Sequence, residues 1–152
     1  MKYLVILFLS LSYSIAALCQ AGNPIYDKTL ADSLGADEYG MKSYIFVILK
    51  TGPNKIKDKS VSDSLFKGHI ANINRLADAG KLVVAGPFGK NDKEYRGLFI
   101  LNVQTTEEAQ ALLQTDPAIQ QKVFAVELIR WYGSAALPMY LDFHKKIEKE
   151  KI

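Results

Sequence analysis

Cysteine and histidine are scarce in this chain, and their scarcity narrows the chemistry that it can perform. The single cysteine, Cys19, excludes an internal disulfide and a cluster of thiolate metal ligands. The two histidines, His69 and His144, lie far apart in different settings, whereas a metal centre needs several ligands together. The turn Gly52-Pro53-Asn54 does not have the pattern of a phosphate-binding loop. We therefore expect no metal ion and no cofactor.

An excess of charge of one sign is also lacking. The net charge is +3, and it falls to +2 if Lys2 is removed with a leader peptide. This value is too small to indicate a nucleic-acid partner. Two groups of lysines are typical of solvated surfaces, the first in a polar loop and the second alternating with glutamates. They are Lys55, Lys57 and Lys59, and Lys145, Lys146, Lys149 and Lys151.

One long apolar run is present, from Tyr3 to Leu18 after the positive charge of Lys2. It predicts a signal peptide over residues 1–20, because it is too short and wrongly flanked for a membrane span. We expect an exported protein, periplasmic or secreted, with no stable membrane span after cleavage. An uncleaved anchor and a lipid on Cys19 are the alternatives. Leu18 disfavours the lipid, because it is larger than the residue that usually precedes a lipidated cysteine.

The remaining chain, of roughly 130 residues, suffices for one domain with one core. Residues 21–41 carry Gly, Pro, Asp and Ser without periodicity and predict a linker. The domain is expected over residues 42–134, followed by a helical tail over residues 135–152. Helical spacing predicts a helix from Ser62 or Asp63 to the glycine stop at Gly80. A second helix is expected from Thr105, with a break at Asp116-Pro117. Strands are expected at 43–49, 82–85, 97–103 and 123–132.

The order β-α-β-β-α-β predicts an α+β fold. It suits a ferredoxin-like split β-α-β unit, with a four-stranded antiparallel sheet covered by two helices on one face. The strands are apolar on both faces, as in the alternation of Phe46 with Val47, whereas a solvated face should be polar. A second copy packed sheet against sheet would cover the other face, so we expect a homodimer.

His69 and Asp116 are the candidate catalytic residues. His69 follows Phe66 by three residues and precedes Ile73 by four, which places it on the sheet side of its helix. A carboxylate on one ring nitrogen would fix the tautomer and make the other nitrogen a better proton acceptor. Taken singly, each residue is better explained by a structural role: His69 bonded to a carbonyl, and Asp116 capping the turn that begins at Pro117.

Three further residues are candidates for substrate binding. Arg96 precedes a strand beside the hairpin loop and could hold an anionic group of a substrate, although a surface arginine has the same pattern. Gly86 and Pro87 could bring backbone close to a ligand, although a plain chain reversal explains them as well.

Several motifs together resemble the YCII-related (YciI-like) family, over about Tyr44 to Gly133. They are Gly68-His69 with Ile73 and Leu76, the run from Gly80 to Phe88, Arg96-Gly97, Asp116-Pro117, Val126-Glu127 and Trp131-Tyr132-Gly133. The resemblance implies a ferredoxin-like protomer in a dimeric α/β barrel, with a His–Asp dyad at His69 and Asp116. Dehydrochlorinase-like chemistry has been associated with the family. The leader, linker and lysine-rich tail depart from its small cytosolic members, so no cytosolic substrate is carried over.

Two classes of function follow from these observations. The first is an exported small-molecule enzyme of the lyase, isomerase or hydrolase type, in which His69 and Asp116 perform general acid/base proton transfer. The second is a non-catalytic dimeric domain that binds a small molecule or a protein partner. The sequence does not name the substrate.

Overall fold

The computed structural model describes residues 23–150, so the predicted leader, Cys19 and Lys151 lie outside the described residues. Its elements follow the predicted order. They are α2 (Lys28–Leu34), β1 (Met41–Thr51), α3 (Lys59–Asp78), β2 (Leu82–Pro87), β3 (Tyr95–Leu101), α4 (Thr106–Leu113), α5 (Pro117–Gln120), β4 (Phe124–Ser134), the 3-10 turn η2 (Leu137–Met139) and α6 (Tyr140–Ile147). No helix among residues 23–150 is long and apolar enough to cross a membrane.

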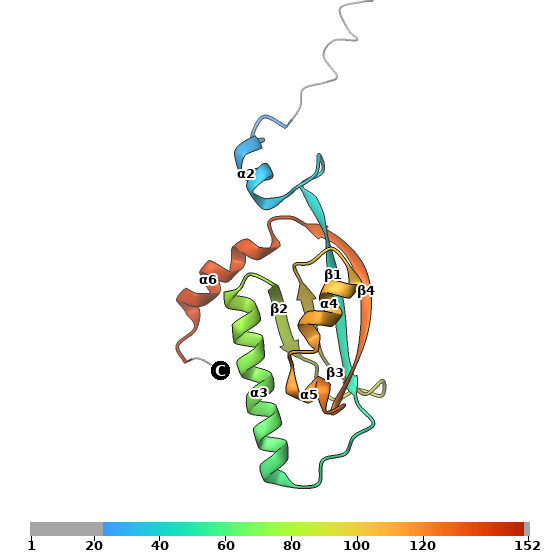
Figure 1. Ribbon diagram of the computed structural model, residues 1–152. Helices are drawn as coiled ribbons and strands as arrows, with labels where there is room; N and C mark the ends of the chain where they lie inside the picture. Colours follow the sequence, from blue (N-terminus) through green and yellow to red (C-terminus); the bar gives the residue numbers. More distant parts are fainter. Residues whose placement is uncertain (1–22, 151–152) are drawn as a thin grey trace, which may run out of the picture.

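The four strands form one antiparallel sheet in the order β2-β3-β1-β4. Helices α3, α4 and α5 lie on one face of this sheet (Figure 1). This arrangement confirms the predicted α+β, split β-α-β fold with a C-terminal helix. Strands β1 and β4 pair over their full length, from Met41 opposite Ser134 to Thr51 opposite Phe124. Both are longer than predicted, because a strand continues while its backbone finds partners, whatever the polarity of its side chains.

The main core lies between the sheet and the three helices. Eleven buried residues form it: Ile45, Val47, Leu49, Leu76, Leu82, Phe99, Leu101, Val103, Ala109, Leu113 and Ile119. Alternate residues of β1 and β3 contribute, as the period of two in a strand requires. A core of this kind fixes α3 and α5 against the sheet and thereby fixes the side chains that they carry.

Helix α3 begins earlier than the sequence predicted, and Asp58 caps it. The Asp58 carboxylate accepts a hydrogen bond from the backbone N–H of Val61. The predicted start at Ser62 or Asp63 was therefore wrong, because an equally good cap lies four residues before Ser62. The predicted apolar stripe is also displaced, since Phe66 is 57% exposed while His69, Asn72 and Leu76 are buried.

The hairpin of β2 and β3 differs from the prediction at one point. Gly86 and Pro87 belong to β2 and pair with Leu98 and Gly97 of β3, so they are not the predicted chain reversal. The reversal comes later, at residues 89–94. Proline has no backbone N–H to donate to a neighbouring strand. Pro87 is tolerated because β2 is an edge strand, and no other strand of this sheet pairs with its outer side.

The second face of the sheet is partly covered by the C-terminal segment. Tyr44, Val83 and Ile100 form a smaller buried cluster there, and Leu137 packs against it. The hydroxyl of Tyr140 donates to the carbonyl oxygen of Val83 on the edge strand. The tail thus covers the β2 side of this face and leaves the β4 side, with Ile129 42% and Trp131 37% exposed, open to solvent.

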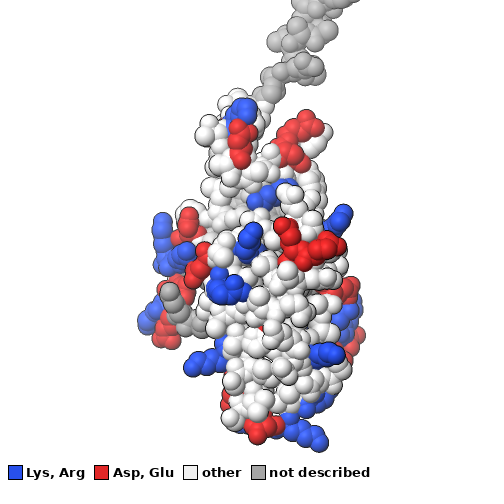
Figure 2. Space-filling view, in the orientation of Figure 1, with Lys and Arg blue, Asp and Glu red and all other residues white. Residues whose placement is uncertain are grey.

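Residues 23–41, most of the predicted linker, make contact with the domain. They contain α2, and the hydroxyl of Tyr132 on β4 donates to the carboxylate of Asp37. This hydrogen bond is the main reason that the pKa of Asp37 is lowered and that of Tyr132 is raised to about 12. Acidic and basic side chains are interspersed on the face seen in Figure 2, in keeping with the small net charge.

Candidate functional site

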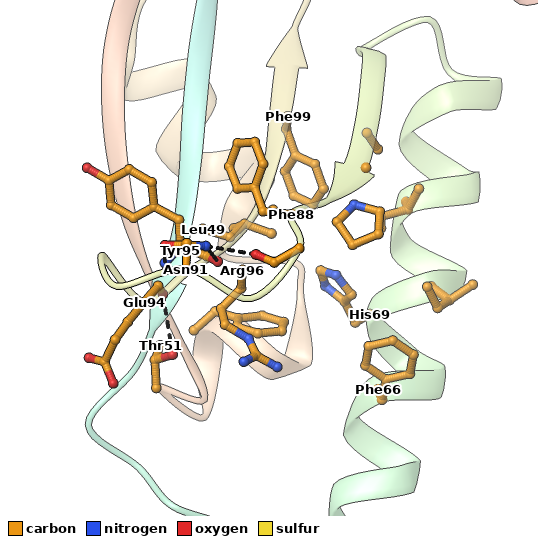
Figure 3. A pocket seen from close by; sticks show the side chains of 18 of the residues that line it. Leu49, Thr51, Phe66, His69, Phe88, Asn91, Glu94, Tyr95, Arg96 and Phe99 are labelled. Carbon is orange, nitrogen blue, oxygen red and sulfur yellow. Dashed lines mark hydrogen bonds between the residues drawn. The ribbon is translucent and has the colours of Figure 1, made fainter.

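A cleft of about 870 Å³ opens between α3, β2, β3 and the loop that joins these strands. Helix α3 contributes Phe66, His69, Ile70 and Ile73, and the hairpin contributes a continuous stretch from Ala85 to Asn91. Figure 3 shows the labelled side chains converging on this space from both walls. The volume is within the range of sites that hold small molecules.

His69 and Asp116 meet at the inner wall of the cleft. Nδ1 of His69 lies 2.6 Å from Oδ2 of Asp116, and the two residues are 5% and 0% exposed. A carboxylate can only accept a hydrogen bond, so Nδ1 carries the hydrogen in this pair. The sequence left open whether these residues touch, and the structure brings them into direct contact.

His69 lines the cleft, and its other ring nitrogen, Nε2, points away from Asp116 because Nδ1 is the nitrogen bonded to that carboxylate. Within residues 23–150, no buried side-chain nitrogen or oxygen lacks a hydrogen-bond partner. The structure gives Nε2 no such partner among these residues, which means that this nitrogen is not buried. In the neutral ring it carries the lone pair, because the hydrogen is on Nδ1. The arrangement presents a proton acceptor to any molecule in the cleft.

Asp116 holds its position through both roles that the sequence suggested. It is the N-cap of α5, and its Oδ1 accepts a hydrogen bond of 2.9 Å from the backbone N–H of Ala118. Its Oδ2 is left for His69. Pro117 occupies the first helical position, where its fixed φ suits the helix. Capping therefore orients the carboxylate instead of competing with the histidine for it.

The dyad depends on a close approach of α3 to α5. A Cβ atom on Gly68 would lie 2.6 Å from Cγ of Pro117, which is closer than real Cβ contacts. Glycine at this position lets Pro117 pack directly on the helix backbone. Gly68 therefore packs against Pro117, and the residues next to them in the sequence, His69 and Asp116, form the hydrogen bond.

A second polar network ties α3 to the segment before Asp116. Arg75 donates hydrogen bonds of 2.7 Å to Oδ1 of Asn72 and to the hydroxyl of Thr115. That hydroxyl lies 2.9 Å from Oδ1 of Asn72 and 2.6 Å from the carbonyl oxygen of Leu112. Sequence reasoning missed these residues, because polar side chains on a helix usually face solvent.

Three phenyl rings surround the imidazole of His69. Ring centroids lie at 6.0 Å for Phe66, 5.9 Å for Phe99 in a stacked arrangement, and 5.1 Å for Phe124. They come from one helix and two strands, so no local spacing predicted the group. Phe66 is exposed because its side of α3 faces the cleft and not the core.

The structure places all three predicted substrate-binding residues in the lining of the cleft. Arg96, Gly86 and Pro87 line it together with His69. The binding roles assigned to them remain predictions. His144, the other histidine, is exposed on α6 and is absent from the lining. Within residues 23–150 no group of three His, Cys, Asp or Glu side chains is placed to hold a metal ion.

Comparisons with known proteins identify a family. A family model described as the YCII-related domain matches residues 44–132, which is more than half of the chain. It confirms the resemblance found in the sequence motifs. No curated protein gives a significant match.

One similar solved structure is the 5-chloro-2-hydroxyhydroquinone dehydrochlorinase of Burkholderia phenoliruptrix in complex with 2,5-dihydroxybenzoquinone. It is 23% identical, the match covers 57% of this chain and 92% of that one, and the TM-score is 0.41. A likeness of this size assigns neither a substrate nor a reaction to the present chain.

Proposed function

This chain belongs to the family of YCII-related domains, and from that premise we propose that it is a small-molecule enzyme that transfers protons through His69 and Asp116. The observation that carries the proposal is the 2.6 Å contact between Nδ1 of His69 and a buried carboxylate oxygen at the wall of a cleft. Burial of both side chains preserves this hydrogen bond, because little water competes for it.

His69 acts as the base in the proposed proton transfer. The lone pair of Nε2 takes a proton from the substrate, so that an N–H bond forms as a C–H or O–H bond breaks. The electron pair of the broken bond stays on the substrate. The ring becomes an imidazolium, and the Asp116 carboxylate stabilises its charge through Nδ1–H. Return of the proton at another atom gives an isomerisation, and loss of a leaving group gives an elimination.

His69 and Asp116 can also activate a water molecule, so the proposal includes lyase, isomerase and hydrolase chemistry. The phenyl rings of Phe66, Phe99 and Phe124 support it in one further respect. They surround the imidazole with apolar surface, and an electrostatic interaction in such surroundings is stronger than in water.

We extend the proposal to export and to assembly. Export follows from the leader predicted over residues 1–20, and the mature domain would then act in the periplasm or outside the cell. Assembly as a homodimer follows from the exposed apolar residues on the β4 side of the second sheet face, Ile129 and Trp131. A second copy with the same patch would cover them in a two-fold arrangement.

The test uses carbon acids in deuterium oxide, with hydrogen exchange into solvent followed by proton NMR over a panel of small ring compounds and keto acids. We expect the protein to accelerate exchange for at least one compound. His69→Asn should abolish the acceleration while the protein stays folded, because asparagine cannot take the proton at this position. His144→Asn is the matched control and should exchange at the wild-type rate, since His144 is exposed on α6.

Two results would contradict the proposal. Exchange that survives His69→Asn places the base elsewhere. Loss of ligand affinity without any enzymatic exchange favours the second class of function, a dimeric binding domain in which His69 hydrogen-bonds a bound acid.

A further inference from the structure

We propose that the cleft selects a small aromatic acid, whose ring lies among the phenyl side chains and whose carboxylate pairs with Arg96. The inference rests on the proposed function for the reacting atom, Nε2 of His69, and deepens it by naming the class of substrate. The selection itself depends on the lining of the cleft and not on catalysis.

The shape of the site favours a flat ring. Five aromatic residues line the cleft: Phe66, Phe88, Tyr95, Phe99 and Phe124. Three of them also surround His69, and Phe88 and Tyr95 form a tilted pair at 6.4 Å on the hairpin side. Figure 3 shows the labelled rings of Phe66, Phe88 and Phe99 on the side of the space where His69 projects. Aromatic walls bind a ring by stacking and edge contacts, which an aliphatic ligand of equal size makes less well.

The charge of the site favours an anion. Arg96 makes no side-chain hydrogen bond and no ion pair within residues 23–150, although it lines the same cleft as His69. Lys90, at the hairpin, is likewise unpaired within this range. Other nearby cations are engaged: Lys50 pairs with Glu127, and Arg75 bonds Asn72 and Thr115. An unpaired guanidinium matches the planar, two-oxygen geometry of a carboxylate.

Among the residues that the structure describes, Glu94 is the only one with a carboxylate that lines the cleft. It forms no ion pair with Arg96 within residues 23–150, and Figure 3 shows the carboxylate of Glu94 beside Thr51, apart from the guanidinium of Arg96. Asp116, the other carboxylate near the site, is 0% exposed and is bonded to His69, so it does not pair with Arg96 or Lys90. A ligand carboxylate can therefore pair with Arg96 without displacing an existing partner, which a neutral compound cannot do.

The test measures binding by NMR titration with three probes: benzoate, the uncharged benzamide, and cyclohexanecarboxylate, which keeps the charge but has no flat ring. We expect benzoate to bind best. Arg96→Gln should weaken benzoate binding roughly 10- to 100-fold, the effect of losing a charge-assisted pair, and leave benzamide binding unchanged. Arg130→Gln is the matched control, because Arg130 is an exposed arginine that does not line the cleft.

Benzoate binding that ignores Arg96→Gln, or equal binding of benzoate and benzamide, would overturn the assignment of the acid group. Equal binding of benzoate and cyclohexanecarboxylate would overturn the assignment of the ring. The His69→Asn variant separates this inference from the proposed function. If no exchange activity is found but benzoate still binds through Arg96 in that variant, the proton-transfer proposal fails and the acid site stands. If exchange depends on His69 but benzoate does not bind, the acid site fails and the proton-transfer proposal stands.

Discussion

At the scale of single residues, the sequence marked His69 and Asp116 as candidates but did not predict their contact. His69 was placed on the buried side of its helix by the spacing of its apolar neighbours, and Asp116 was marked by the proline after it. Their contact depends on how closely α3 approaches α5, and this distance is set by tertiary packing. Asn72, Arg75 and Thr115 were missed for the same reason, since they bond across two segments of the chain.

Removal of the Asp116 carboxylate should cost stability as well as activity. Asp116→Ala deletes the cap of α5 and leaves Nδ1 of His69 buried without a partner. We expect a loss of about 2–4 kcal/mol in the free energy of unfolding, from about 1 kcal/mol for the cap and 1–3 kcal/mol for the unpaired group. Urea unfolding measures this loss.

Asp116→Asn provides the comparison, because the side-chain oxygen of asparagine can still cap Ala118. It should cost clearly less stability than Asp116→Ala. Equal losses in the two variants would mean that the cap contributes nothing.

At the scale of elements, hydrophobic periodicity predicted which helices and strands exist and in what order. It predicted less well which side of each element is buried. The predicted stripe of α3 put Phe66 in the core, whereas Phe66 faces the cleft and polar Asn72 is buried. A pattern of apolar residues cannot distinguish a side that packs on protein from a side that lines a site. The strand ends were misplaced because pairing between β1 and β4 continues through polar residues.

Because α3 and α5 are in close contact at Gly68, we expect Gly68→Ala to destabilise the protein, although alanine favours a helix. Gly68→Ala gains up to about 1 kcal/mol of helix propensity but forces Pro117 away, and overpacking of this kind costs about 1–3 kcal/mol. We expect a lower free energy of unfolding and a weaker bond between His69 and Asp116. In a double-mutant cycle, Gly68→Ala should cost less in the Pro117→Ala background, as measured by urea unfolding. Equal costs in both backgrounds would refute the packing argument.

The bond between Tyr132 and Asp37 should hold residues 23–41 to the domain over a defined range of pH. The lowered pKa of Asp37 means that its contribution is present above its ordinary value of 3.8 and is lost as pH falls through the lower, folded value. The raised pKa of Tyr132 means that its contribution is present below 10.0 and is lost as pH rises through about 12.

Hydrogen exchange of residues 23–37, corrected for the intrinsic rate at each pH, and their limited proteolysis should therefore be constant near neutral pH and increase in strong acid and in strong base. Tyr132→Phe should increase both at neutral pH, because the hydroxyl donor is lost. Tyr39→Phe is the control, since Tyr39 is 77% exposed and its hydroxyl makes no such bond. An unchanged exchange pattern in Tyr132→Phe would show that other contacts hold the segment.

At the scale of the whole molecule, apolar residues on both faces of the strands predicted that something covers the second face. Part of the cover is the chain's own tail, through Leu137 and Tyr140. The sequence did not predict this, because a charged terminal helix gives no sign of where it packs. The β4 side stays exposed, and the proposed dimer concerns that side alone.

Dimer formation should be sensitive to charge on this exposed side. Ile129→Asp would place a carboxylate in the proposed interface, where desolvation opposes its burial, and should give the mass of a monomer in sedimentation equilibrium. Gln110→Asp, on the exposed side of α4, is the control and should leave the dimer intact. A wild-type protein that is monomeric at all concentrations would contradict the proposed assembly.

We propose above all that Asp116 fixes the tautomer of His69 and leaves Nε2 as the proton acceptor in the cleft. Nitrogen-15 NMR of the imidazoles tests it most directly, in the wild type and in Asp116→Asn, with exposed His144 as the internal reference. We expect neutral His69 in the wild type to carry its hydrogen on Nδ1. In Asp116→Asn the amide N–H₂ should face the ring and move that hydrogen to Nε2. A wild-type ring with its hydrogen on Nε2, or a tautomer that ignores Asp116→Asn, would contradict the account.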